Sequence, residues 1–348
     1  MNRLEYIGSK YQLIPWLHEQ ILAATGWNTF AGRRVADLFA GTAVVSHHFR
    51  QQGAIVHAND AEFYSAAIAH ATVRSSYNLK CKLLIARWNA DLVAGKHATT
   101  CDFITRNYSP YEGCERMFFT VENARRIDYL RLRLLAVRPT LAEDDFYFLL
   151  ASILTSADSI KNTTSVYGAY LKQFKKRAEA ALILKPIHTA GSSAAVAASS
   201  ATCYSAATAA AALQSNGRLD AAYLDPPYNQ RQYSKNYFPL NEIAKPPGSQ
   251  TEIKGVTGIP ADCFLSDFCK AATVEQAFRD VVSAINAEWV FISYNSESLV
   301  PRPRLIEILE EYGTVTVAER EYKRFKSSDI TEDKEIVEYL FCLKKISN

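Results

Sequence analysis

The chain has 348 residues, of which 48% are hydrophobic and 22% charged, and its formal net charge is +3. No apolar run reaches the ~20 residues that span a bilayer, and residues 1–6 lack the apolar centre of a signal peptide, so we expect a cytoplasmic protein. The seven cysteines are scattered without a C-x-x-C pair. This pattern excludes a disulfide framework and a zinc knuckle, and no metal site is indicated.

The positive charge is concentrated in the middle of the chain. Residues 66–188 contain 18 Lys and Arg against 11 Asp and Glu, whereas the remainder contains 21 against 25. A basic segment within a mildly acidic protein is typical of a region that binds a polyanion.

The first predicted elements alternate between helix and strand. A helical pattern runs from Lys10 to Leu22 and another from Val44 to Gln52. Short apolar runs at 35–39 and 54–58 indicate strands, and the second ends at Asn59-Asp60, which we expect to cap a helix over 61–74. Strand, glycine turn, helix, strand and acid, in this order, are typical of the opening of a doubly wound nucleotide-binding sheet.

The alternation stops between residues 75 and 185. Phe119–Val137 and Asp144–Ile160 are predicted as two long helices, the second beginning among acids that favour a helix N-terminus. Gly168–Leu184, with four basic residues, is predicted as a third helix. We therefore expect residues 75–185 to be a helical insertion that divides an α/β sheet domain built from residues 1–74 and 186–348.

After the insertion the α/β alternation returns. Ala221–Leu224 is predicted as a buried strand that leads directly into Asp225. The Pro- and Gly-rich stretch Asn229–Pro260 is predicted as a long loop, and loops of this length are usually functional. The other predicted elements are a strand at 202–204, a helix ending near 213, a helix at 267–285, a strand at 289–294, a helix at 304–312, and a terminal hairpin with strands at 315–320 and 336–343.

The clearest chemical signal is Asp225-Pro226-Pro227-Tyr228, directly after the buried strand. A ring-conjugated amine such as that of adenine is a weak nucleophile, so its methylation needs acceptors for the N–H hydrogens and a flat surface for the base. Asp225 supplies a carboxylate, and the Pro226 carbonyl is a second acceptor aimed by the turn that Pro227 fixes. Tyr228 supplies a stacking face for a base rotated out of a duplex. Ligands of open α/β sheets bind at this end of the strands.

With these motifs the chain resembles the N6-adenine DNA methyltransferases of the alpha group, a Dam-like class, in the branch found with type II restriction-modification systems. The resemblance covers nearly the whole chain. It is carried by Tyr6-Ile7-Gly8-Ser9-Lys10, by Asp37-Leu38-Phe39-Ala40-Gly41-Thr42, by Asp60, and by Asp225 to Tyr228, with further similarity at 119–124, 167–172 and 229–233.

The resemblance implies both a fold and an activity. The fold is a Rossmann-like, seven-stranded methyltransferase sheet with an inserted helical target-recognition domain. The activity is transfer of a methyl group from S-adenosyl-L-methionine to the N6 amine of an adenine flipped out of double-stranded DNA. Whether a cognate restriction endonuclease acts on the same site stays open, as do the recognition sequence and the oligomeric state.

The resemblance also implies a set of cofactor-binding residues. Physical reasoning agrees with it, because Gly41 lets the backbone approach a ligand closely, Asp60 can accept both ribose hydroxyls, and Lys10 can pair with the cofactor carboxylate. The implied residues are Tyr6, Gly8, Ser9, Lys10, Asp37, Phe39, Ala40, Gly41, Thr42, Asp60, Ala61 and Asp225. Two departures from the family pattern stand out. Ala43 replaces a glycine, and Ser205-Ala206 replaces an acid that contacts the adenine of the cofactor.

Basic and aromatic residues outside these motifs are candidates for binding DNA. They are Arg125, Arg126, Lys172, Lys175, Lys176, Arg177, Arg231, Tyr233, Lys323, Arg324 and Lys326. Two alternative functions are compatible with parts of the sequence. One is a methyltransferase that acts on RNA adenine or on a protein glutamine, and the other is a non-catalytic DNA-binding subunit of a modification or defence system. Asp225 argues against the first, whose members typically carry Asn at this position, and the intact tetrapeptide argues against the second.

Overall fold

A seven-stranded sheet forms the centre of the computed structural model, which describes residues 4, 6–189, 194–322 and 336–346. The strand order is β3-β2-β1-β4-β7-β9-β8. The first five strands of that order are parallel, and β9 is antiparallel to both of its neighbours. The strands are β1 (Arg34–Asp37), β2 (Ile55–Asn59), β3 (Ser200–Thr202), β4 (Leu219–Leu224), β7 (Ala287–Asn295), β8 (Gly313–Tyr322) and β9 (Ile336–Lys345). The Rossmann-like sheet predicted from the sequence is therefore confirmed.

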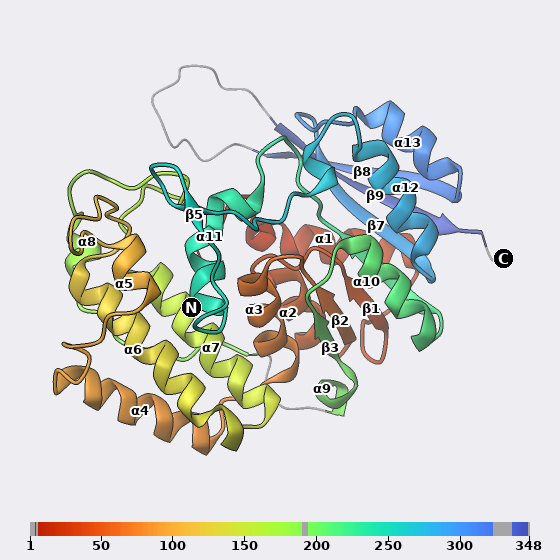
Figure 1. Cartoon of the computed structure of the whole chain (residues 1–348). Coiled ribbons are helices and arrows are strands. Elements are labelled where there is room, and N and C mark those ends of the chain that lie inside the picture. The colour runs from red at the N-terminus through yellow and green to blue at the C-terminus, as the bar shows by residue number, and fades with distance from the viewer. Residues whose placement is uncertain (1–3, 5, 190–193, 323–335, 347–348) are drawn as a thin grey trace.

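Helices cover both faces of this sheet (Figure 1). The helices α1 (Ile14–Thr25), α2 (Val44–Gln51) and α3 (Phe63–Arg74) cover one face, and α10 (Ala206–Leu213), α12 (Val274–Ala284) and α13 (Arg302–Glu310) cover the other. Because successive strand side chains point to opposite faces, Ala221 and Tyr223 join the first hydrophobic cluster, whereas Ala222 and Leu224 join the second. These helices overlap the predicted ones.

The helices of the middle segment gather at one side of the sheet (Figure 1). They are α4 (Leu79–Val93), α5 (Phe103–Tyr108), α6 (Val121–Val137), α7 (Glu143–Asp158) and the short α8 (Lys176–Glu179). Glu143, Asp144 and Asp145 occupy the first turn of α7, as expected. Buried side chains of these helices share one hydrophobic cluster with α1–α3, so the segment does not have a separate core. No helix in the described part of the chain is both long and apolar enough to cross a membrane.

The predicted helix Gly168–Leu184 is wrong, because only Lys176–Glu179 is helical. Side-chain amides of neighbouring helices and loops hold the rest of this segment in a non-helical conformation. Asn162 Oδ1 accepts the Lys175 N–H (3.1 Å), Asn123 Oδ1 accepts the Leu182 N–H (2.9 Å), and Asn89 Oδ1 accepts the Leu184 N–H (2.9 Å). Tertiary hydrogen bonds therefore override the local propensity.

The prediction of an unbroken loop over Asn229–Pro260 is also wrong. This stretch contains the helix α11 (Tyr233–Ala244) and a small hairpin of β5 (Ile253–Lys254) and β6 (Ile259–Pro260). Pro239 inside α11 is accompanied by a kink at Tyr237 (φ −132°), where the helical backbone is interrupted. The helix is retained because most of its second half is buried.

The cap expected for α3 differs in detail. Glu62, not Asn59-Asp60, occupies the N-cap position and makes no side-chain cap bond. The Asp60 carboxylate instead accepts the backbone N–H groups of Glu62 (2.9 Å) and Gly41 (2.8 Å). Asp60 therefore joins the start of α3 to the glycine turn that follows β1.

Candidate active site

A cavity of about 220 Å³ opens at the carboxyl ends of β1, β2 and β4. The neighbouring strands β1 and β4 are the point at which strand order reverses, where α/β sheets bind ligands. All of the residues predicted to bind the cofactor, and the whole tetrapeptide from Asp225 to Tyr228, line this one cavity. Segments far apart in the sequence are thus brought together as predicted.

The glycine turn after β1 forms one wall of the cavity. Gly41 has φ +53°, and a Cβ at this position would lie 3.0 Å from Cε1 of Tyr6. The Ser65 hydroxyl donates to the Gly41 carbonyl (2.8 Å). Ala43, where the family pattern has glycine, also takes a left-handed conformation (φ 57°) and is fully buried. The substitution is therefore accommodated, in a backbone region that L-residues rarely adopt.

Three buried carboxyl groups, those of Asp37, Asp60 and Glu62, line the cavity near the glycine turn and the start of α3. Burial raises the pKa of Asp37 to about 7, of Asp60 to about 6 and of Glu62 to about 8. Asp37 Oδ2 accepts the Ser46 hydroxyl (2.6 Å), whereas its buried Oδ1 has no partner among the described residues. Glu62 was missed by sequence reasoning, because it is two residues beyond the predicted acid in a segment read as helix.

The turn from Asp225 to Tyr228 is organised around the Asp225 carboxylate. Oδ1 accepts the Tyr228 hydroxyl (2.9 Å) and forms an ion pair with Lys10 Nζ (2.8 Å). Among the described residues, none donates a hydrogen bond to Oδ2. Burial raises the pKa of Asp225, and the Lys10 ammonium opposes that rise.

Lys10 is more constrained than the sequence indicated. It is 3% exposed, and its ammonium also donates to the Gly8 carbonyl (3.1 Å) and lies 4.8 Å from the centre of the Tyr228 ring. A cation at this distance is attracted by the ring. Asp225 and Gly8 accept two of its three N–H donors, so a cofactor carboxylate bound by Lys10 would share this ammonium with Asp225.

Tyrosines of α11 hold the N-terminal motif against the cavity. The Tyr237 hydroxyl accepts the Ile7 N–H (2.9 Å), and the Tyr233 hydroxyl donates to the Ile7 carbonyl (3.3 Å). The Tyr6 ring stacks on Tyr237 at 4.7 Å between ring centres. Tyr233, predicted to bind DNA, is thus a half-buried part of the cavity wall.

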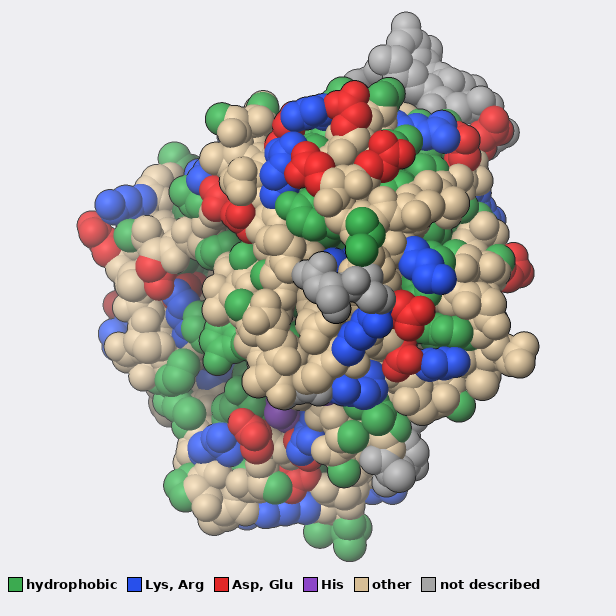
Figure 2. All heavy atoms as spheres, turned by 90° about the vertical axis from the view of Figure 1, so that its right-hand side faces the viewer, with side chains coloured by type: hydrophobic (Ala, Val, Ile, Leu, Met, Phe, Trp, Pro, Cys, Tyr) green, Lys and Arg blue, Asp and Glu red, His purple; other side chains and the backbone are tan. Residues whose placement is uncertain are grey.

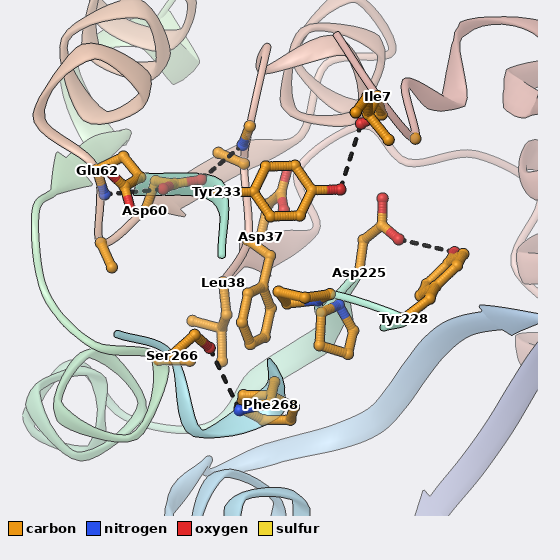
Figure 3. Close-up of a pocket in the computed structure, with 18 of the residues that line it drawn as sticks. Ile7, Asp37, Leu38, Asp60, Glu62, Asp225, Tyr228, Tyr233, Ser266 and Phe268 are labelled. Carbon is orange, nitrogen blue, oxygen red and sulfur yellow. Dashed lines mark hydrogen bonds between the residues drawn. The ribbon is translucent and has the colours of Figure 1, made fainter. Parts of the chain in front are cut away.

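The cavity is long and has chemically different ends. Figure 3 shows Asp60 and Glu62 toward one end, Asp225 and Tyr228 toward the other, and the Tyr233 ring between them.

The start of α10 also lines the cavity, through Ser205, Ala206 and Ala207. Ser205 is the N-cap of this helix, and its hydroxyl oxygen accepts the Thr208 N–H. Sequence reasoning did not predict the wall formed by Phe264, Ser266 and Phe268, because it lies in a segment without a motif.

The basic residues predicted to bind DNA divide into three groups. Arg125 packs on Tyr111, Arg126 pairs with Glu122, and the Lys175 ammonium donates to the Thr163 carbonyl, so these three make internal contacts. In contrast, Lys172, Lys176, Arg177 and Arg231 are exposed, and Arg231 lines the cavity. Lys323, Arg324 and Lys326 lie outside the described residues.

The face that carries α12 and α13 has a different character. Figure 2 shows basic and acidic side chains interspersed across it. Ion pairs account for part of this pattern, because Arg279 binds Glu311 (2.7 Å) and Arg304 binds Glu275 (2.7 Å). Such mutual neutralisation does not favour a polyanion, whereas the exposed basic residues of 172–177 lie on the helical side of the molecule.

Comparison with known proteins identifies the family of the chain. Residues 6–288 match the model of the D12 class N6 adenine-specific DNA methyltransferases. The chain is 38% identical to the type II methyltransferase M.CviAII of Paramecium bursaria Chlorella virus 1, over 98% of both chains. It is 34% identical to M.NlaIII of Neisseria lactamica, over 98% of this chain and 99% of the relative. It is 32% identical to M.FokI of Planomicrobium okeanokoites, over 98% of this chain and 53% of that relative. No solved structure matches the chain significantly.

Proposed function

The chain belongs to the family of D12 class N6 adenine-specific DNA methyltransferases, and on this premise we propose that its cavity holds S-adenosyl-L-methionine beside an adenine flipped out of double-stranded DNA. Site-specific adenine methylation of DNA is the activity that its family and relatives assign to it. The observation that carries the proposal is the arrangement at Asp225, where two donors bind Oδ1 and Oδ2 is left for the target amine.

The residues on the cofactor side fit a methyl donor of this kind. Gly41 leaves room for the Tyr6 ring, which lines the cavity, and the Asp60 carboxylate can accept ribose hydroxyls beside the two N–H groups it already binds. The buried Asp37 Oδ1 has no hydrogen-bond partner among the described residues, and an ammonium group of the ligand would provide one. When bound, S-adenosyl-L-methionine supplies an electrophilic methyl group on its sulfonium.

The residues at the other end fit an adenine amine. Asp225 Oδ2 and the Pro226 carbonyl accept its two N–H hydrogens, which directs the nitrogen lone pair out of the ring plane. The Tyr228 ring holds the base by stacking, an interaction typical of flipped bases. The Lys10 ammonium pairs with Asp225 Oδ1 and lies over the Tyr228 ring. It therefore balances the charge of the Asp225 carboxylate and orients Oδ2 for the amine. These side chains therefore bind and orient the amine before the reaction.

Double-stranded DNA is the proposed macromolecular substrate, and we assign residues 75–185 to target recognition. Flipping a base costs a few kcal/mol, which phosphate contacts by Lys172, Lys176, Arg177 and Arg231 would offset. The segment that carries the first three packs beside the cavity, because the Tyr167 N–H donates to the Asn236 carbonyl (2.8 Å) on α11. The proposal also includes a cytoplasmic location and a cognate endonuclease that acts on the same DNA site.

Transfer of labelled methyl groups tests the proposal. We expect label on N6 of adenine in a mixed-sequence DNA duplex and none on RNA or on protein glutamine. Asp225→Asn should lower transfer strongly, because the neutral amide oxygen is a weaker acceptor than the carboxylate and the NH2 group is a donor where a second acceptor oxygen stood. Asp220→Asn is the matched control at the opposite end of β4, where Asp220 pairs with Arg33. Label on RNA or protein, or full activity of Asp225→Asn, would contradict the proposal.

A further inference from the structure

A second carboxyl group lies beside the catalytic tyrosine, on a strand that no motif marks. Glu338 on β9 is 8% exposed, and its Oε2 lies 3.4 Å from the Tyr228 hydroxyl. Its side chain points to the same face of β9 as Leu340 and Cys342, which belong to the hydrophobic core. Burial of a carboxyl group at an otherwise apolar position is costly, so the position of Glu338 requires an explanation.

The surroundings of Glu338 connect it to the reaction centre. Tyr228 and Lys10 face it from the catalytic turn and the N-terminal motif, Asp225 adds a like charge, and Asn295 is its register partner on β7. On β8 its register partner is Arg320. Glu338, Tyr228 and Asp225 therefore form a chain of side chains in contact, and Lys10 forms an ion pair with Asp225 at the end away from Glu338.

The direction of the hydrogen bonds in this series follows from the number of protons. A tyrosine hydroxyl has one proton to donate, and the shorter contact, 2.9 Å, assigns it to Asp225 Oδ1. The second contact then needs a donor on Glu338. Burial raises the pKa of Glu338, the Lys10 ammonium opposes that rise and the nearby Asp225 adds to it. In its protonated form the Glu338 carboxyl group is the donor that the Tyr228 oxygen needs.

We propose that Glu338 is a positioning residue for methyl transfer, which holds the Tyr228 hydroxyl on Asp225 and thereby fixes both the stacking ring and the acceptor carboxylate. This inference rests on the function proposed above. The other described contacts of Tyr228, apart from Asp225, act on its ring or backbone and not on its hydroxyl group. Tyr294 meets the Tyr228 ring edge-on at 5.2 Å, and the Leu299 N–H binds only the Tyr228 backbone carbonyl. Glu338 Oε2, at 3.4 Å, is a second carboxyl oxygen at the hydroxyl, beside Asp225 Oδ1 at 2.9 Å.

Two substitutions separate positioning from a purely structural role. Glu338→Gln keeps a donor for the Tyr228 oxygen and should retain kcat within about threefold. Glu338→Met keeps the volume but has no donor, and replacing a buried charged or polar group with an apolar one is often neutral for stability. We expect Glu338→Met to lower kcat about tenfold, equivalent to about 1.4 kcal/mol, with little change in the KM of the methyl donor.

A double-mutant cycle with Tyr228→Phe provides the decisive measurement. If Glu338 acts through the hydroxyl, Glu338→Met should have no further effect once that hydroxyl is absent. Glu319→Gln on the adjacent strand is the control, because Glu319 is exposed, pairs with Arg302 and should be dispensable. Thermal unfolding and binding of S-adenosylhomocysteine verify that each variant is folded.

The outcomes distinguish this inference from the function on which it rests. A wild-type protein that transfers no methyl group to adenine in DNA refutes the proposed function. An active wild type with unchanged kcat in Glu338→Met, or equal and additive losses in the cycle, overturns the role of Glu338. A loss in Glu338→Gln as large as that in Glu338→Met also overturns it, since the amide preserves the donor.

Discussion

The contact between Gly41 and Tyr6 gives the sharpest test of the cofactor side of the cavity. Gly41→Ala adds one methyl group at φ +53°, 3.0 Å from Tyr6 Cε1 and 3.4 Å from Cζ. The ring has little freedom to move away, because it stacks on Tyr237 and packs at 5.4 Å from Tyr233. The backbone of Gly41 must therefore shift instead, and its N–H is the donor to Asp60.

The loss of stability expected for Gly41→Ala has two parts, and the variant Gly26→Ala separates them. A left-handed alanine costs about 1–2 kcal/mol of stability, and an added group in a packed site costs about 1–3 kcal/mol more. Gly26, the C-cap of α1, has φ +71° with nothing within 4 Å of its Cβ direction. Gly26→Ala should therefore show only the first cost, and Gly41→Ala both.

Only Gly41→Ala should affect the methyl donor. Displacing the Gly41 N–H also displaces Asp60, and loss of about 1.4 kcal/mol of binding corresponds to a tenfold weaker affinity. Urea unfolding gives the stability of both variants, and titration with S-adenosylhomocysteine gives the affinity. If Gly41→Ala binds this ligand as tightly as Gly26→Ala does, the Tyr6–Gly41–Asp60 arrangement is not what shapes the donor site.

Three further predictions concern charge. Burial raises the folded-state pKa of Asp37 to about 7 from a usual value of 3.8, so its contribution to stability is greatest below pH 4 and is lost as the pH rises to about 7. The free energy of unfolding, measured in urea, should therefore fall less between pH 5 and pH 8 in Asp37→Asn than in the wild type. An equal fall in both proteins contradicts this prediction. Arg131→Met leaves the buried Asp128, 3.1 Å from Arg131, without its cation and should reduce the free energy of unfolding by about 3–5 kcal/mol; a loss below about 1 kcal/mol refutes this estimate. Replacing Lys172 and Lys176 with Ser should weaken DNA binding and make its log–log salt dependence less steep by about 0.9 per lost phosphate contact, and an unchanged slope removes these lysines from the interface.

Local sequence signals determined the two halves of the sheet and the chemistry at its edge. The runs at 35–39 and 54–58 and the strand before Asp225 are short, apolar and ended by turn residues, and they became β1, β2 and β4 with boundaries shifted by up to two residues. The motifs at Gly41, Asp60 and Asp225 follow those strands, and parallel strands place their carboxyl ends at one edge. Their meeting in one cavity was therefore predictable.

Tertiary contacts decided what the local pattern did not encode. Residues around 168–184 have a helical composition but bind the amides of Asn89, Asn123 and Asn162. Conversely, α11 forms in spite of Pro239 because its other residues are buried against the cavity wall and the helical segment. In both cases the free energy of long-range contacts exceeded the small differences in local propensity.

The charge state of the reaction centre likewise depends on the fold. The sequence by itself determined that this chain has an acid, two prolines and a tyrosine after a buried strand, and hence which chemistry it performs. Only the tertiary structure places Lys10 on Asp225 and Glu338 beside Tyr228, from opposite ends of the chain. The sequence predicted Lys10 only as a partner of the cofactor and gave no signal for Glu338, because burial of both side chains around Asp225 and Tyr228 arises from long-range packing.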